Sequence, residues 1–214
     1  MTNEAGRPPE EGPPRGRRQV TRGAARRDQI IAVAFMEFTA NGFRGASLAR
    51  IAERSGLTQP GLLHHFPSKT ALLRAVLEER DRRDSERLGI DLDADVPWHV
   101  LLSDLVALVE YNAKAPGLVQ MFTVVTGEAV TDEHPARPWA AARYRRLTAH
   151  AERALRRGVD DGELRQDLDV RACAQRLFAM MDGLQTQWLI EPESVDMASA
   201  FRGYVDEVRR AITA

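Results

Sequence analysis

Residues that commonly carry catalysis or bind metals are few in this chain, which has five histidines and one cysteine in 214 residues. His64 and His65 are adjacent, so on a helix their side chains diverge by about 100° and do not favour a shared metal ion. Cys173 lies between two alanines, as a small core residue would. The remaining histidines have no cysteine, histidine or carboxylate partner at the usual ligand spacing: His99, His134 and His150. Because the chain also has no glycine-rich phosphate loop and no G-x-S-x-G motif, the sequence predicts no enzyme, no metal site and no cofactor.

A binding chemistry is indicated instead by two short helical segments that meet at Gly56-Leu57-Thr58. Ser47 is placed to cap a helix that runs to Ser55, and Thr58 is placed to cap a second helix that Pro67 ends. A helix about 10–12 Å wide fits the major groove of DNA, which is about 12 Å wide. The pair therefore has the pattern of a helix-turn-helix, although short helix pairs joined at glycine also occur in other all-α proteins.

The distribution of charge favours a polyanionic partner at one end of the chain. Residues 1–74 hold 12 basic and 6 acidic side chains, whereas residues 75–214 hold 18 and 25. A basic segment on an acidic body is typical of nucleic-acid binding. The simpler interpretation is a basic tail with no partner, since Arg15, Arg17 and Arg18 lie close together in the sequence.

The residues around the helix pair resemble the N-terminal domain of the tetracycline-repressor (TetR) family of transcriptional regulators over about 50 positions. The matching residues are Ala34-Phe35, Phe38, Asn41-Gly42-Phe43, Ser47-Leu48, Ile51-Ala52-Glu53-Arg54-Ser55-Gly56-Leu57, Leu62-Leu63-His64-His65-Phe66-Pro67-Ser68-Lys69 and Leu72-Leu73. Asp182-Gly183-Leu184-Gln185 and Trp188 are similar to a C-terminal domain common in that family. This resemblance implies a homodimeric regulator, most often a repressor, that binds double-stranded DNA.

The resemblance also implies a role for individual residues. The residues expected to face the major groove are Thr58, Gln59, Gly61, Leu63 and His64. Phosphates would be contacted by Ser47, His64 and Lys69, and the DNA backbone or minor groove by Arg26 and Arg27, for which a solvated surface charge is the alternative. Among the departures from the family, Leu63 stands where tyrosine is frequent, and Arg50 replaces the acid that would complete a capping box with Ser47. We expect Arg50 to approach a phosphate instead.

The elements that position these residues all have helical periodicity, so we expect an all-α protein of about nine helices. Residues 1–21 are predicted to be a disordered basic and proline-rich tail, 22–68 a helix-turn-helix domain, and 69–214 an effector-binding and dimerisation domain. The first helix is expected over residues 24–40, and the last two over 170–190 and 195–212, capped by Asp169 and Ser194. No apolar run approaches the roughly 20 residues of a membrane span, and no signal peptide is recognisable, so the sequence predicts a cytoplasmic protein.

The C-terminal part is predicted to hold a cavity for a small apolar or amphipathic effector. The candidate lining residues are Leu102, Met121, Phe122, Val125, Tyr144, Met181, Gln185 and Trp188, although each of them also fits an ordinary core position. The alternative function is a dimeric DNA-binding regulator without a small-molecule effector, controlled by a protein partner or by its own abundance.

Wide apolar stripes on the last two helices predict a homodimer that is built as a four-helix bundle. The residues expected at this interface are Leu177, Met181, Leu184, Phe201, Tyr204 and Val208. The same stripes are compatible with the inner core of a monomer, and the resemblance favours the dimer.

Overall fold

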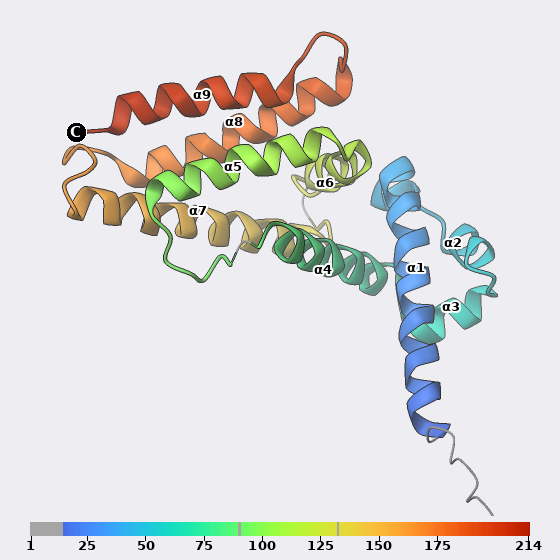
Figure 1. Ribbon diagram of the computed structural model, residues 1–214. Coiled ribbons are helices and arrows are strands. Elements are labelled where there is room, and N and C mark those ends of the chain that lie inside the picture. Colours follow the sequence, from blue (N-terminus) through green and yellow to red (C-terminus); the bar gives the residue numbers. More distant parts are fainter. Residues whose placement is uncertain (1–14, 90, 132) are drawn as a thin grey trace, which may run out of the picture.

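The computed structural model describes residues 15–89, 91–131 and 133–214, and within these residues it contains nine α-helices and no strand beyond one isolated bridge between Leu164 and Thr213 (Figure 1). The helices are α1 (Arg15–Gly45), α2 (Leu48–Arg54), α3 (Gln59–His65), α4 (Lys69–Leu88), α5 (Trp98–Ala113), α6 (Pro116–Glu128), α7 (Arg137–Asp160), α8 (Val170–Ile190) and α9 (Met197–Ile212). The predicted all-α fold is confirmed. None of the helices in the described ranges is both long and apolar enough to cross a membrane.

The first helix begins earlier than the sequence analysis predicted. It starts at Arg15, so residues 15–21 are helical and do not belong to a disordered tail, while residues 1–14 of that predicted tail lie outside the described residues. The physical reason is that Pro14 is the last proline before the helix, and the Arg, Gln and Ala residues that follow it are good helix formers. A long polar helix therefore leads into the apolar stripe that starts at Ile30.

Side chains cap four of the nine described helices at the places that the sequence indicated. The hydroxyls of Ser47, Thr58 and Ser68 accept hydrogen bonds from the third backbone N–H of α2, α3 and α4, and the Asp169 carboxylate does the same for α8. The last helix differs from the prediction, because its cap is the Asp196 carboxylate and not Ser194. A carboxylate at an N-terminus also interacts favourably with the helix dipole, and Ser194 is part of the preceding turn.

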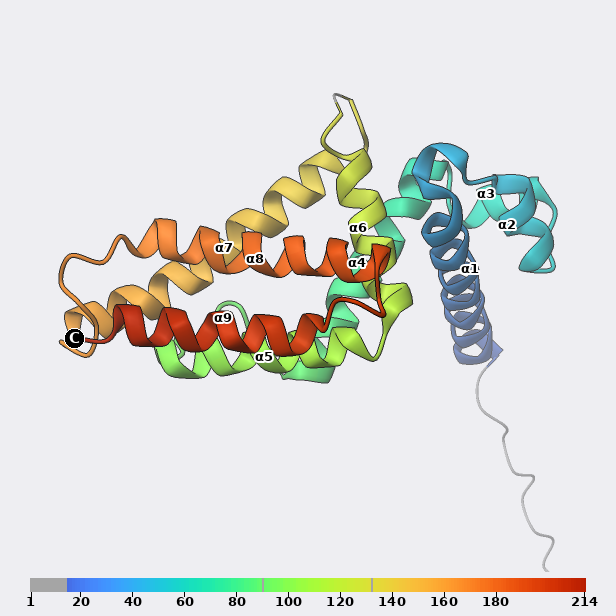
Figure 2. The same cartoon turned by 90° about the horizontal axis from the view of Figure 1, so that it is seen from above.

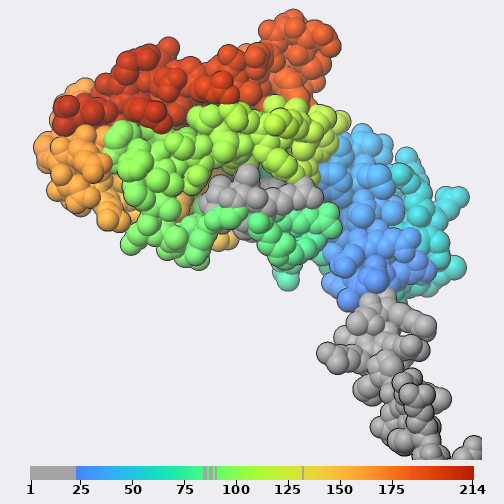
Figure 3. All heavy atoms as spheres, in the orientation of Figure 1, coloured from blue at the N-terminus to red at the C-terminus, as the bar shows by residue number. Residues whose placement is uncertain are grey.

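The helices form a small head and an elongated body. Figures 1 and 2 show α1, α2 and α3 at one end, with α5, α7, α8 and α9 extended side by side at the other end and α4 and α6 between them. The space-filling view shows the α1 surface meeting α4 and the α5–α6 corner (Figure 3). Two groups of buried side chains follow this division, one in the head and one in the body.

The core of the head continues into the body. Ile30, Phe38, Ile51 and Leu62 pack in one cluster with residues of α4, and the same cluster includes Met121 and Val125 of α6. A rigid displacement of α4 or α6 would therefore change the packing of the head. The predicted domain boundary between residues 68 and 69 stays a prediction.

Candidate nucleic-acid interface

The turn between α2 and α3 is held by backbone geometry that glycine provides. Gly56 has a φ of 66°, a left-handed conformation that costs glycine little. The Gly56 N–H donates to the Glu53 carbonyl (2.9 Å) and the Leu57 N–H donates to the Ala52 carbonyl (2.8 Å). With Ile51, Ala52 and Leu62 buried beneath it, the helix pair has one fixed arrangement.

The second helix of the pair presents its N-terminal end and one face to solvent. Thr58, Gln59 and His64 are exposed, and Gly61 and Leu63 are half-buried. The structure thus brings the five residues expected in the major groove together on α3 and its cap. Their contact with DNA remains a prediction, and their exposure is what such contact requires.

The two arginines expected near DNA already have partners within the head. The Arg26 guanidinium donates to the Ser55 carbonyl at the end of α2 (3.1 Å) and to the Gln29 side chain (2.8 Å). The Arg27 guanidinium donates to the His65 carbonyl at the end of α3 (2.8 Å) and stacks over the Phe66 ring. Both arginines therefore fix the ends of the helix pair against α1, where carbonyl groups lack helical partners.

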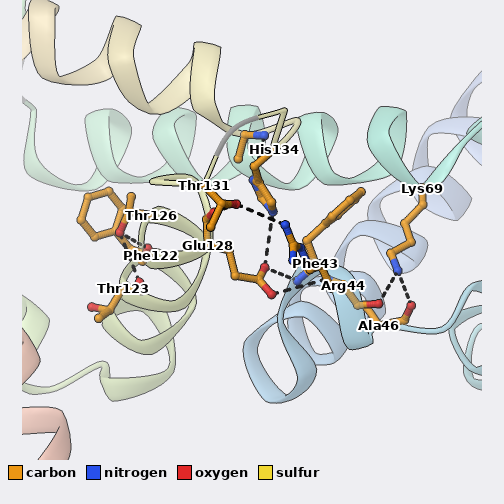
Figure 4. A network of polar contacts seen from close by, with 11 residues as sticks. Phe43, Arg44, Ala46, Lys69, Phe122, Thr123, Thr126, Glu128, Thr131 and His134 are labelled. Atoms are coloured by element: carbon orange, nitrogen blue, oxygen red, sulfur yellow. Dashed lines mark hydrogen bonds and ion pairs between the residues drawn. The ribbon is translucent and has the colours of Figure 1, made fainter.

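Lys69 has a similar role at the next junction. Its ammonium donates to the backbone carbonyls of Arg44 (3.1 Å) and Ala46 (2.7 Å), and it lies 4.9 Å from the centre of the Phe43 ring. These contacts join the first residue of α4 to the segment between α1 and α2 (Figure 4). An ammonium has three N–H groups, so one remains for the predicted phosphate contact.

A buried carboxylate that was not among the predicted site residues completes the hydrogen bonding at the N-terminus of α2. Glu37 of α1 is 2% exposed, accepts a hydrogen bond from the Ser47 N–H (3.2 Å) and pairs with Arg50 (3.5 Å). Glu37 thus supplies, from another helix, the carboxylate that the missing acid at position 50 would have provided. The signal available in the sequence was an acidic residue inside the apolar stripe of residues 30, 34 and 38.

The end of α1 is also bonded directly to α6. The Glu128 carboxylate accepts hydrogen bonds from the backbone N–H of Phe43 (2.6 Å) and, more weakly, of Arg44 (3.5 Å). Gly42 has a φ of 65°, and a Cβ at that position would overlap the Glu128 carboxylate. Figure 4 shows this carboxylate pointing from α6 toward the end of α1. We call this contact the α1–α6 junction.

A buried histidine and a threonine complete the α1–α6 junction. The His134 Nδ1 atom accepts a hydrogen bond from the Ala136 N–H (3.2 Å), and the His134 Nε2 atom lies 3.5 Å from Glu128 Oε2. The His134 ring also lies edge-on to Phe43. On the other side, the Arg44 guanidinium donates to the Thr131 hydroxyl (3.3 Å). Nothing in the sequence indicates the hydrogen bonds that cross from α1 to α6 and the following loop, because their partners are about 85 positions apart.

The eight residues expected to line an effector cavity lie in the body, but they are divided between its packed regions. Leu102, Met181 and Trp188 belong to the core cluster of the body, whereas Met121 and Val125 belong to the cluster that extends from the head. Phe122 and Gln185 are buried, and Tyr144 is half-buried. Their role in ligand binding remains a prediction.

Polar side chains on α4, α7 and α8 gather beside Phe122 in this region. The Arg143 guanidinium and the Trp139 indole both donate to the Asp81 carboxylate (2.6 and 3.0 Å), and the guanidinium groups of Arg80 and Arg143 lie over the Phe122 ring. The Tyr144 hydroxyl donates to the Asp182 carboxylate (2.6 Å). Burial is the main cause that raises the pKa of Asp182, and it also raises the pKa of Tyr144.

The six residues expected at a dimer interface fall into two groups. Leu177, Met181 and Phe201 are at most 6% exposed because they pack inside their own chain, whereas Leu184, Tyr204 and Val208 are half-buried. The apolar surface of α8 is formed instead by Met180 and Ile190, which are 38% and 73% exposed. Met180 and Leu184 are therefore accessible on α8, whereas Leu177 and Phe201 are buried in the chain's own core, and the dimer interface stays a prediction.

Among the described residues, no group of three or more histidine, cysteine or carboxylate side chains is placed to hold a metal ion. Cys173 is buried in α8, and burial raises the pKa of its thiol, so the reactive thiolate is disfavoured.

Comparison with known families assigns both parts of the chain. Residues 30–76 match the family described as bacterial regulatory proteins, tetR family, and residues 102–211 match the C-terminal domain of BetI-type transcriptional repressors. The chain is also 29% identical to the probable HTH-type transcriptional regulator ArpR of Pseudomonas putida over 84% of this chain and 88% of that protein. It is 26% identical to the HTH-type transcriptional regulator TtgR, also of Pseudomonas putida, with the same coverage.

Solved structures of related regulators have the same fold. SmeT, the repressor of the Stenotrophomonas maltophilia multidrug efflux pump SmeDEF, is similar with a TM-score of 0.71 and 25% identity, over 88% of this chain and 90% of SmeT. The SmeT–triclosan complex gives a TM-score of 0.74 at 24% identity, over 89% and 92% of the two chains. With both family matches and this fold in agreement, the chain belongs to the TetR family of bacterial transcriptional regulators and is not an enzyme.

Proposed function

We propose that this protein is a ligand-responsive regulator, most often a repressor in its family, that binds a palindromic operator as a homodimer and is released or modulated by a small apolar or amphipathic effector. The observation that carries this proposal is the exposed face of α3, on a head that is bonded to α6 by the Glu128 carboxylate. Its DNA partner would lie in the bacterial cytoplasm, so we propose that the protein acts there.

The chemistry of α3 supports readout of bases. An exposed glutamine side chain pairs bidentately with adenine in the major groove, and a threonine methyl contacts the methyl group of thymine. Gln59 and Thr58 supply these groups, and His64 lies about one and a half turns further along α3. Because one head offers few base-reading side chains, two heads on a palindrome are needed for tight binding.

Control by an effector is supported by the body of the molecule. Phe122 and Trp139 provide aromatic surface, and Asp182 provides a buried carboxylate with one oxygen that has no hydrogen-bond partner. The related SmeT structure holds triclosan, a small aromatic compound. An effector changes DNA binding only if its affinity differs between two arrangements of the heads. The α1–α6 junction connects the two regions, since Phe122 and Glu128 lie on the same helix.

The experiment that tests this proposal measures the melting temperature and the operator affinity of the full chain with a panel of small apolar compounds, triclosan first. At least one compound is expected both to raise the melting temperature and to change operator affinity. A panel in which compounds raise the melting temperature but leave operator affinity unchanged would favour the alternative, a DNA-binding regulator that has no small-molecule effector.

A further inference from the structure

A groove of about 370 Å³ lies where the head meets the body, between α1, α4 and the α5–α6 corner. Its apolar walls include Ile31, Phe35 and Met36 of α1, Val76 of α4 and Leu118 of α6. Met36 is 46% exposed, so the groove leaves part of this apolar surface open to water. None of the eight residues expected to line the effector cavity, and none of those expected to contact DNA, is among its lining residues.

The charged side chains of the groove all come from α4. Glu79, Arg80 and Arg83 line it, and the buried Arg80 guanidinium also pairs with the Asp81 carboxylate (3.6 Å), so Arg83 is the basic side chain that reaches the solvent. The Arg83 guanidinium bonds the Glu79 carboxylate (2.6 Å) and is about half exposed, so it borders both the apolar wall and the solvent. Glu79 also accepts two hydrogen bonds from Arg82, so this carboxylate is surrounded by guanidinium groups.

We propose that this groove is a second binding site, which takes a small amphipathic anion with an aromatic or alkyl body and a single carboxylate or sulfonate. The volume falls within the range of small-molecule pockets, about 300–1,000 Å³. The apolar body covers Phe35, Met36 and Leu118, and the acidic group lies beside Arg83. Because a guanidinium is planar and always charged, it suits recognition of such an oxyanion.

The position of the groove gives this ligand a distinct effect. One wall belongs to α1, which carries the head, and the other walls belong to the body. A molecule that contacts both walls has a higher affinity for the arrangement of head and body in which the groove is formed. It therefore stabilises this arrangement without occupying the predicted effector cavity.

The test uses the full chain and 1-anilinonaphthalene-8-sulfonate (ANS), an aromatic sulfonate, with bound ANS per chain measured by equilibrium dialysis. Ala32→Trp fills the groove from the exposed side of α1, and Ala25→Trp places the same side chain on the same helix outside the groove. We expect Ala32→Trp to remove one ANS site per chain and Ala25→Trp to remove none. Equal stoichiometry in the two variants would overturn the proposal.

The negative charge that we propose for the ligand is tested separately. Arg83→Gln is expected to weaken ANS binding at this site about two- to fivefold, the effect of a partly exposed ion pair. Met36→Glu changes an exposed position and is expected to weaken ANS binding further by adding a negative charge. This variant replaces Ala32→Trp as the test if Ala32→Trp does not fold. N-phenyl-1-naphthylamine, which lacks the sulfonate, is expected to bind more weakly than ANS. If it binds the site equally well, the assignment of an anionic ligand is wrong.

Discussion

At the scale of single residues, four basic side chains that were expected to contact DNA form hydrogen bonds or ion pairs within the protein. Arg26 and Arg27 bond the carbonyl ends of α2 and α3, Lys69 bonds two carbonyls near the end of α1, and Arg50 pairs with Glu37. These partners could not be predicted, because a sequence does not show which donors find a carbonyl or a carboxylate. Replacing the four residues would alter DNA affinity through the shape of the head as well as through lost phosphate contacts.

The clearest prediction at this scale concerns Glu37. Glu37→Gln removes the charge that bonds the Ser47 N–H and pairs with Arg50, so we expect a loss of about 1–3 kcal/mol in the free energy of unfolding. Denaturant unfolding of the full chain measures this loss. Glu53→Gln, an exposed position on α2, is the matched control and should change little.

A second variant distinguishes this explanation from a general loss of packing. In the double variant Glu37→Gln with Arg50→Glu, the new acid lies three residues after Ser47 and completes a capping box. We expect the pair of changes to destabilise less than the sum of the single changes. Strict additivity would show that Glu37 does not substitute for an acid at position 50.

At the scale of elements, helix periodicity and capping residues predict the nine helices of the described chain, but they miss the start of α1 and the cap of α9. Local signals set the helices, as the confirmed caps Ser47, Thr58 and Ser68 show. The α1–α6 junction could not be predicted, because Glu128 and His134 have nothing in their neighbourhood that identifies Phe43 and Arg44 as partners. The burial of Leu177 and Phe201 could not be predicted from the sequence either, since a wide apolar stripe does not show which of its edges faces the chain's own core.

The α1–α6 junction makes a prediction that depends on a single glycine. Gly42→Ala places a Cβ against the Glu128 carboxylate and forces a φ of 65° on a residue with a side chain. We expect the free energy of unfolding to fall by about 2 kcal/mol or more, from backbone strain together with the overlap. Thermal and denaturant unfolding of the full chain give the value.

Gly45→Ala is the matched control for this change, three residues further along α1. A Cβ there would lie 3.4 Å from the Asn41 Cβ, an ordinary contact. Since alanine is favoured over glycine in a helix, we expect no destabilisation. If both alanine variants lost the same stability, the special role of Gly42 in the junction would be refuted.

At the scale of the whole molecule, the proposed binding to a palindromic operator requires two heads held at a fixed separation. The body supplies two long adjacent helices, α8 and α9, whose inner faces pack on the core and whose outer surface keeps Met180, Leu184 and Tyr204 at least partly accessible. Covering this surface with a second copy would bury apolar area and fix the distance between heads.

The dimer is tested by sedimentation of the 23.9 kDa chain at micromolar concentration, where we expect about twice the chain mass. Met180→Glu combined with Leu184→Glu should give folded monomers with greatly weakened operator binding. Ala149→Glu, on the exposed side of α7, adds one such negative charge elsewhere and should leave the dimer intact. A wild-type monomer with full operator affinity would contradict this arrangement.

Operator binding itself is tested by the affinity of the full chain for a palindromic fragment of the promoter beside its own gene, measured at several salt concentrations. Binding through two heads with about six to ten phosphate contacts predicts that affinity falls about 10³- to 10⁵-fold between roughly 50 and 200 mM salt. Gln59→Ala should keep this salt dependence and lose about 1–3 kcal/mol of preference at one base pair in each half-site. No binding to the fragment at low salt would contradict the account.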